Sequence, residues 1–288
     1  MERFDIVIIG AGPAGMSAAL TAKNRNKKFL LIGDGISGKV EKAHTVQNYL
    51  GLPNISGKDM AEVFRNQLKQ MGIEITEKRV SAIYSMGEYF AIQAGNGMIE
   101  STTVILATGM ANGIELPGEK KFLGRGVSYC ATCDAMLYKN KKTIVIGYDK
   151  KEEKEAEFLS EVAESVLYIP MYKEETKLSP NVEVLRDIPE EIVGEDMVTA
   201  LKTKNGEYPA HGIFILRESI APEQLVPGLK IEENHVHVNA KMETNIKGCF
   251  ACGDIAGQPY QYIKSAGQGN VAAISAVKYI ADLKSNNQ

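Results

Sequence analysis

The residues of this chain best suited to chemistry are its cysteines, because a thiolate is both a nucleophile and a metal ligand. The four cysteines form two Cys-x-x-Cys pairs, Cys130 with Cys133 and Cys249 with Cys252. At the start of a helix, cysteines three residues apart share one face and can form a disulfide, and the helix N-terminus lowers a thiol pKa. The first pair therefore predicts a redox disulfide, with a metal site or simple burial as alternatives.

The second pair, Cys249 and Cys252, lies in a strand-like segment instead. Residues three apart on a strand face opposite sides, with Cα atoms roughly 10 Å apart, which is beyond disulfide reach. A zinc site built from both pairs would need four converging thiolates and would consume the redox pair. We therefore expect these two side chains to be small apolar fillers and predict no metal site.

A glycine-rich string, GAGPAG, occupies residues 10–15 between a short predicted strand and an alanine-rich helix. In that context Gly10 permits a tight turn, Gly12 lets the backbone approach a pyrophosphate, and Gly15 allows close helix–strand packing. Asp34 ends the next strand, where an acidic residue can bind a ribose hydroxyl, although Asp before Gly is also ordinary turn chemistry. The pattern predicts a dinucleotide site; the alternative is a glycine-rich turn without a ligand.

The elements that must position these residues follow an α/β order. The expected elements are a helix at 56–71 capped by Ser56, strands across 79–106, a strand at 143–147, a hairpin turning at Asn205-Gly206 and a long helix at 263–283. The 288 residues suffice for about two domains. Changes of pattern near residues 113 and 240 predict one domain at 1–112 and 241–288, and a second at 113–240.

Composition limits the classes of function. The formal charge of -3 argues against a strongly basic nucleic-acid binder, and no nucleic-acid motif is visible. The sequence contains no run of about 18 apolar residues, so we expect no membrane span. The opening MERFDIVIIG has no secretory signal pattern, so we expect a cytoplasmic protein.

Nearly the whole chain resembles the low-molecular-weight thioredoxin reductases. The resemblance is carried by GAGPAG, by the string QNYLG at 47–51, by ATG at 107–109, by CATCD at 130–134, by GD at 253–254, and by Gln261 with SAG at 265–267. It implies an α/β fold of two doubly wound, Rossmann-like dinucleotide-binding domains, the second inserted in the first, and a homodimer.

The resemblance also assigns roles. It makes Cys133 the sulfur next to the flavin, Cys130 the sulfur that attacks thioredoxin, and Asp134 the acid/base. It implies FAD as cofactor, held by Gly10, Gly12, Pro13, Ala14, Gly15, Asp34, Asn48, Thr108, Gly109, Gly253, Asp254 and Gln261.

The sequence departs from the family at the second nucleotide site. Where the family has a second Gly-x-Gly-x-x-Ala motif, this chain has Asp149 for the second glycine and Glu152 for the alanine. A carboxylate there repels a pyrophosphate. In place of the family's His-Arg-Arg cluster for the 2′-phosphate of NADP, the chain has Lys173 flanked by two glutamates. Both halves of the NADPH site are therefore predicted to be missing.

Electrons must then reach the flavin from another donor. The chain is similar to the ferredoxin-dependent flavin thioredoxin reductases, so we predict reduced ferredoxin as donor and thioredoxin as acceptor. Basic docking candidates for an acidic ferredoxin are Lys120-Lys121 and Lys139, Lys141 and Lys142, although charge runs are usually plain solvated surface. The alternatives are an atypical NAD(P)H-linked reductase, a reductase holding a second flavin, and a flavin-bound sensor without turnover.

Overall fold

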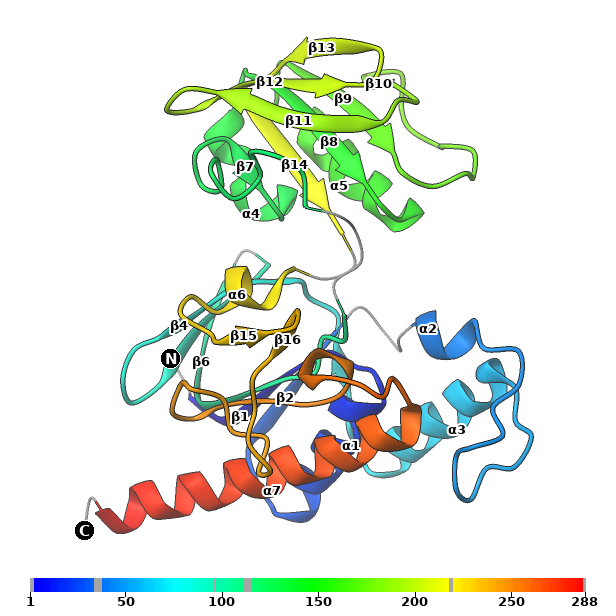
Figure 1. Ribbon diagram of the computed structural model, residues 1–288, viewed down its shortest axis with the longest axis vertical. Coiled ribbons are helices and arrows are strands. Elements are labelled where there is room, and N and C mark those ends of the chain that lie inside the picture. The colour runs from blue at the N-terminus through cyan, green and yellow to red at the C-terminus, as the bar shows by residue number, and fades with distance from the viewer. Residues whose placement is uncertain (1–2, 34–37, 96, 111–114, 218–219, 287–288) are drawn as a thin grey trace. The chain divides into compact units, whose positions relative to one another are not determined.

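The computed structural model describes residues 3–33, 38–95, 97–110, 115–217 and 220–286. It divides into two compact units, one formed by Met1–Met110 with Ala221–Gln288 and the other by Ala111–Ile220 (Figure 1). The second unit is inserted in the first, as predicted.

The first unit is built on a mixed seven-stranded sheet in the order β3-β2-β1-β6-β5-β4, with β17 also paired to β6. Its strands are β1 (Phe4–Ile9), β2 (Phe29–Ile32), β3 (Ile75–Thr76), β4 (Val80–Ser85), β5 (Phe90–Ala94), β6 (Gly97–Leu106) and β17 (Cys249–Ala251). Strands β3, β2, β1, β6 and β17 pair in parallel, while β4 and β5 form antiparallel pairs. The parallel part brings the carboxyl ends of β1, β2 and β6 to one edge, where nucleotides bind in such sheets.

Helices of the first unit come from distant parts of the chain. They are α1 (Pro13–Asn24), α2 (Gly38–Glu41), α3 (Gly57–Gln70), α6 (Pro222–Leu225) and α7 (Tyr262–Asn286), with the short η3 (Asp254–Ala256). Helix α3 begins as predicted, because the Ser56 hydroxyl accepts the N–H of Asp59 at 3.1 Å. Helices α1 and α7 pack closely through buried alanines; a Cβ added at Gly269 would lie 2.0 Å from the carbonyl oxygen of Ala14.

The chain returns to the first unit at Ala221, earlier than the predicted residue 241. Helix α6 contacts β4, and β16 (His235–Val236), which pairs with β15 (Ile231–Glu232), contacts η3. These elements are too short to show a period, and they join the first unit only through residues far away in sequence.

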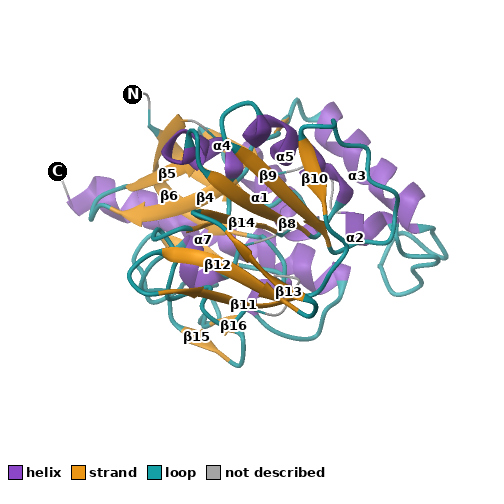
Figure 2. Ribbon diagram, turned by 90° about the horizontal axis from the view of Figure 1, so that it is seen from above, coloured by secondary structure: helices purple, strands orange, loops and turns teal. Residues whose placement is uncertain are grey.

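The second unit has two layers of strands. A parallel sheet has the order β10-β9-β8-β14-β7, and a three-stranded antiparallel sheet has the order β11-β12-β13 (Figure 2). The strands are β7 (Val127–Ser128), β8 (Lys142–Gly147), β9 (Ser165–Pro170), β10 (Val182–Val184), β11 (Pro189–Gly194), β12 (Val198–Thr203), β13 (Gly206–Pro209) and β14 (Gly212–Leu216). The pairing of Thr203 with Gly206 confirms the predicted hairpin turn.

Short helices of the second unit flank its parallel sheet. They are α4 (Ala131–Asp134), η1 (Ala135–Tyr138), η2 (Lys150–Glu152) and α5 (Glu153–Ser160). Helices α4 and α5 contact each other, and the core beneath them includes Tyr138, Tyr168 and Phe214. Among the residues that the structure describes, no helix combines the length and apolar character needed to cross a membrane.

Candidate functional site

The first cysteine pair forms a disulfide at the end of β7. Cys130 is the N-cap of α4, and its Cα lies 5.3 Å from that of Cys133, which confirms the predicted pairing. Cys130 is buried, whereas Cys133 is partly exposed. Helix α4 is a single turn, so its macrodipole is small and individual hydrogen bonds decide the electrostatics at the sulfurs.

Asp134 is tied to the segment that precedes the disulfide. Its carboxylate lies 2.7 Å from the hydroxyl of Ser128, and that hydroxyl also accepts the N–H of Cys130 at 3.2 Å. The predicted acid/base is thus held one hydrogen bond away from the backbone of the first cysteine. Ser128 has no motif around it, so the sequence did not single it out.

A second carboxylate reaches the same turn from α5. Glu155 Oε2 accepts the N–H groups of Ala131 at 2.7 Å and of Thr132 at 3.3 Å. The N–H of Cys133 donates instead to Sγ of Cys130 at 3.2 Å. Glu155 belongs to a charged helix whose sequence gives no sign of this contact, so it too was missed.

A buried ion pair anchors the residue before Cys130. Arg217 contacts both carboxylate oxygens of Glu119, at 2.5 and 2.8 Å, and Glu119 is only 1% exposed. The hydroxyl of Tyr129 and the N–H of Leu116 donate to the same carboxylate at 3.0 and 2.9 Å. Burial raises the pKa of Glu119, but these hydrogen bonds and the charge of Arg217 outweigh it, so the pKa is lowered.

The glycine-rich turn of the first unit is shaped for close backbone approach. Gly10 has φ +109°, and a Cβ there would lie 2.3 Å from the carbonyl oxygen of Ala107 and 3.0 Å from the nitrogen of Thr108. Gly12 is the N-cap of α1 and Pro13 follows at the first helical position, so the capping residue has no side chain that could cover the first N–H groups. A phosphate fits such an end.

The Gly253-Asp254 turn lies against the same helix start. Gly253 has φ +84°, and a Cβ there would lie 3.0 Å from the Cβ of Ala14. Asp254 accepts the hydroxyl of Ser265 at 3.1 Å, and Lys264 donates to the carbonyl oxygen of Gly253 at 2.9 Å. Burial lowers the pKa of Lys264, with the nearby Asp254 acting in the opposite direction. Lys264 was not predicted, since a single lysine in a helix carries no pattern.

The other residues predicted to bind the flavin lie in segments outside the glycine-rich turn. Gly109, with φ +70°, follows β6, and Gln261 directly precedes α7. Asn48 is exposed in the segment between α2 and α3. Asp34 lies outside the described residues. The structure therefore brings together Gly10, Gly12, Pro13, Ala14, Gly15, Thr108, Gly253 and Asp254.

The second cysteine pair has the character of core residues. Cys249 lies in β17 and Cys252 follows it, and both are buried and outside any disulfide. Burial raises both thiol pKa values to about 12. These observations confirm the prediction of apolar fillers. Within the described part of the chain, no three His, Cys, Asp or Glu side chains are arranged to hold a metal ion.

The nucleotide-type turn of the second unit is filled by the protein itself. A Cβ at Gly147, at the end of β8, would lie 2.1 Å from the hydroxyl of Tyr168. Asp149 caps η2 by accepting the N–H of Lys151 at 3.0 Å, and Glu152 and Glu153 are buried just behind it. Carboxylates thus occupy the place where a pyrophosphate would need N–H donors.

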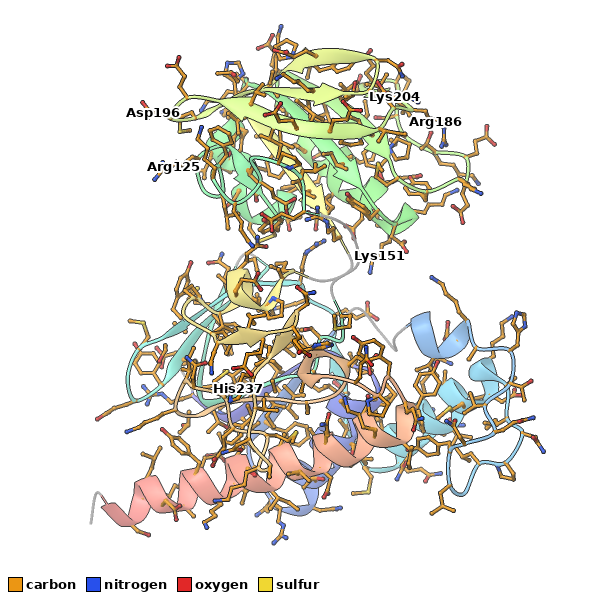
Figure 3. All side chains as sticks on the ribbon, viewed as in Figure 1. Arg125, Lys151, Arg186, Asp196, Lys204 and His237 are labelled. Carbon is orange, nitrogen blue, oxygen red and sulfur yellow. A yellow bond between two sulfur atoms is a disulfide. The ribbon has the colours of Figure 1, made fainter. Side chains whose placement is uncertain are left out.

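The loop after β9, which corresponds to the other half of that nucleotide site, is held by hydrogen bonds within the second unit. The Tyr172 hydroxyl donates to Glu153 at 2.5 Å and lies 3.2 Å from the hydroxyl of Tyr168. Arg186, labelled in Figure 3, donates to the carbonyl oxygens of Tyr172 and Glu174 at 3.1 and 2.7 Å. This cation is therefore engaged by the backbone of the loop and does not form a phosphate clamp.

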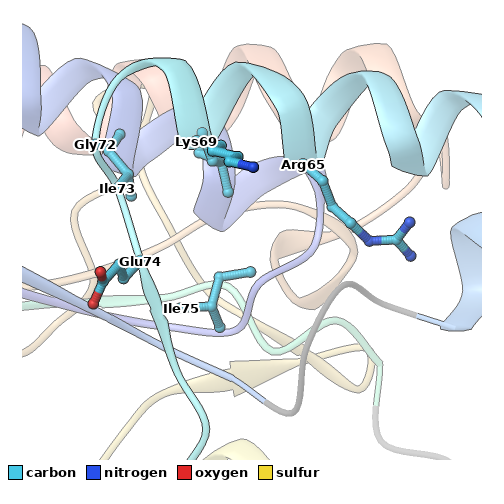
Figure 4. A pocket seen from close by; sticks show the side chains of 7 residues that line it. Arg65, Lys69, Gly72, Ile73, Glu74 and Ile75 are labelled. Carbon is cyan, nitrogen blue, oxygen red and sulfur yellow. The ribbon is translucent and has the colours of Figure 1, made fainter.

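A hollow of about 250 Å³ lies at the end of α3 (Figure 4). It is lined by Arg65, Leu68, Lys69, Gly72, Ile73, Glu74 and Ile75. The lining contains no cysteine, histidine or hydroxyl side chain, and it shares no residue with the predicted site. The hollow therefore supplies no nucleophile for disulfide exchange.

Comparison with known proteins gives one consistent result. Residues 4–148 match the family described as pyridine nucleotide-disulphide oxidoreductase. The thioredoxin reductases of Aquifex aeolicus and Bacillus subtilis are 32% and 31% identical, over 98% of this chain and 94% and 96% of theirs.

Solved structures agree with this. The crystal structure of a ferredoxin-flavin thioredoxin reductase from Clostridium acetobutylicum is 50% identical, with a TM-score of 0.95 over 99% of each chain. A thioredoxin reductase from Gloeobacter violaceus is 30% identical, with a TM-score of 0.84 over 97% of this chain and 95% of that one. Both similarities extend over both units.

Proposed function

This chain belongs to the thioredoxin reductase family, and from that premise we propose that it reduces thioredoxin with electrons from reduced ferredoxin. It is a flavin-dependent disulfide oxidoreductase with FAD as its cofactor. In this proposal the electrons pass through FAD to the Cys130–Cys133 pair and then to thioredoxin. We also propose that the protein is a cytoplasmic homodimer.

The observation that carries the choice of donor is the filled nucleotide turn of the second unit. The Tyr168 hydroxyl fills the space beside Gly147, and Asp149 caps the turn. Glu153 accepts a hydrogen bond from the Tyr172 hydroxyl. A dinucleotide would have to displace buried side chains and face the carboxylates of this turn. The similarity to a ferredoxin-flavin thioredoxin reductase supports an iron–sulfur donor in its place.

The first unit supplies the groups that would hold FAD. When bound, FAD takes up electrons singly or in pairs, which matches a one-electron donor to a two-electron disulfide. The N-terminus of α1 and the turn at Gly10 would receive the pyrophosphate, and Asp254 would accept a hydroxyl of the ribityl chain. We propose lesser contacts from Asp34, Asn48, Thr108, Gly109 and Gln261.

The cysteine pair would then carry out two exchange steps. The thiolate of Cys130 attacks the thioredoxin disulfide, forming a mixed disulfide and releasing one thioredoxin thiolate. The thiolate of Cys133 attacks Cys130, restoring the internal disulfide and releasing the second thioredoxin thiolate. Two electrons pass to thioredoxin, and the two thiolates take up two protons. Asp134 would move one of these protons.

The docking of an acidic ferredoxin remains a prediction for the lysines named above. Lys120 pairs with Glu115 at 2.9 Å, while Lys121 lies over the ring of Phe122. Lys141 donates to the carbonyl oxygen of Leu137, within the turn that follows the redox pair. The group formed by Lys139, Lys141 and Lys142 follows the disulfide segment in sequence, and both lysine groups stay candidates for the docking site.

The test is anaerobic reduction of the flavin, followed by its absorbance. The purified protein is mixed in turn with NADPH, NADH and photoreduced ferredoxin, and thioredoxin is then added. Cys133→Ser serves as the matched control, because it should accept electrons at the flavin without passing them on. Bleaching by ferredoxin, with thioredoxin reduced only by the unchanged protein, supports the proposal.

Three other outcomes would count against it. Rapid bleaching by NADPH would show that the acidic turn of the second unit still accepts a dinucleotide. Failure of reduced ferredoxin to bleach the flavin, with no reduction of thioredoxin, would exclude ferredoxin as the donor. A flavin-to-chain ratio near two would instead favour a diflavin reductase.

A further inference from the structure

The carboxylate of Glu155 accepts two of the backbone hydrogen-bond donors beside the redox pair. Its Oε2 receives the N–H groups of Ala131 and Thr132, at 2.7 and 3.3 Å. The N–H of Cys133 goes to Sγ of Cys130 at 3.2 Å. The first three N–H groups of this turn are thus divided, two going to a carboxylate on another helix and one to a sulfur.

This division opposes the usual electrostatics of a Cys-x-x-Cys turn. Backbone N–H groups at such a turn ordinarily stabilise the thiolate of the first cysteine and lower its pKa. Glu155 takes two of these donors and places its own negative charge beside the residues that follow Cys130. A nearby negative charge favours the protonated thiol. The other carboxylate of the turn, Asp134, has the same sign and is held by Ser128.

We propose that Glu155 is a positioning residue that shifts Cys130 of the reduced pair toward its thiol form, so that a minor thiolate population carries out the attack on thioredoxin. A pair whose reduced form is strongly stabilised is a poor electron donor, as the oxidising members of the Cys-x-x-Cys class show. By withholding that stabilisation, Glu155 favours oxidation of the dithiol to the disulfide, while the acceptor disulfide takes two electrons and two protons. The inference rests on the redox role of the pair and not on the identity of the electron donor.

The test compares Glu155→Gln with a matched control, Glu157→Gln. Glu157 lies on the same helix, but its carboxylate accepts the hydroxyl of Ser179 at 2.7 Å. Glutamine keeps an acceptor oxygen and removes the charge. Both changes are made in a Cys133→Ser background, so that Cys130 titrates alone, and the ultraviolet absorbance of its thiolate is followed against pH, with the Cys130→Ser, Cys133→Ser double variant as blank.

The expected result is a titration midpoint about one pH unit lower in E155Q, which is about tenfold more thiolate, and no shift in E157Q. With both cysteines present and at alkaline pH, the equilibrium of E155Q with dithiothreitol should favour the dithiol by about tenfold, which corresponds to about 30 mV. Neither measurement uses ferredoxin or thioredoxin, so a negative result in either is distinct from failure of the proposed function.

Two results would overturn the inference. One is an unchanged midpoint in E155Q, including the case in which that variant only melts at a lower temperature; Glu155 would then be a purely structural cap. The other is an equal shift in E157Q, which would assign the effect to the overall charge of the helix.

Discussion

Replacement of Arg217 by methionine should destabilise the unit that carries the disulfide. The guanidinium contacts both oxygens of Glu119, a carboxylate that is 1% exposed, and methionine would leave that carboxylate buried without its cation. Removing one partner of a buried ion pair costs about 3–5 kcal/mol. The hydrogen bonds from Tyr129 and Leu116 remain and keep the loss within that range.

The assay is urea unfolding followed by circular dichroism, since the chain contains no tryptophan. Release of FAD reports the first unit separately. With a slope of about 2 kcal/mol per molar urea, the transition of the second unit should shift down by about 1.5–2.5 M. Lys202→Met is the control, because Lys202 pairs with Glu191 at the surface, and its midpoint should hardly change.

The stability difference between the unchanged protein and Arg217→Met should change with pH in a known direction. The pKa of Glu119 is lowered in the folded protein, so the pair contributes stability above the ordinary pKa of 4.5, and this contribution is lost as the pH falls through the folded-state pKa. The difference between the unchanged protein and Arg217→Met should therefore shrink in acid. A midpoint shift below about 0.5 M, or a difference that persists undiminished near pH 3, would refute this reasoning.

Three further predictions concern the flavin and the thiols. Gly10→Ala should abolish FAD binding, because its Cβ would lie 2.3 Å from the carbonyl oxygen of Ala107; flavin per chain is read from absorbance, with Gly97→Ala, which meets no close neighbour, as control. Cys130→Ser should lower thioredoxin reduction to background while flavin content stays normal, and residual turnover would show that electrons reach thioredoxin without Cys130. Asp134→Asn should slow thioredoxin reduction by about 100-fold, and an unchanged rate-against-pH profile would remove it from proton transfer.

The features that the sequence predicted well are local ones. The Ser56 cap and the Cys130–Cys133 pairing each depend on residues three apart, so their geometry follows from spacing alone. The turn at Gly10 was equally predictable, because a strand, a glycine string and a helix follow each other directly. The loss of the second nucleotide site could be predicted, because Asp149 and Glu152 replace residues of a known Gly-x-Gly-x-x-Ala motif.

The features that were missed depend on contacts between distant segments. Glu155 lies 24 residues from the N–H group of Ala131 that it accepts, and nothing in a run of charged residues distinguishes it from its neighbours. Lys264 was missed because its partner, the carbonyl oxygen of Gly253, lies 11 residues away in sequence. The early return to the first unit likewise depends on where α6 packs, which spacing cannot reveal.

The pairing of the first helix with the last one orders the folding of the chain during synthesis. Helix α1 packs against α7, and β6 pairs with β17, so the first unit lacks a strand and a covering helix until the C-terminal segment has emerged from the ribosome. The inserted unit, in contrast, is complete once Ile220 has been made. The thiol-bearing unit can therefore fold first, and the flavin site is completed only once β17 and α7 have emerged.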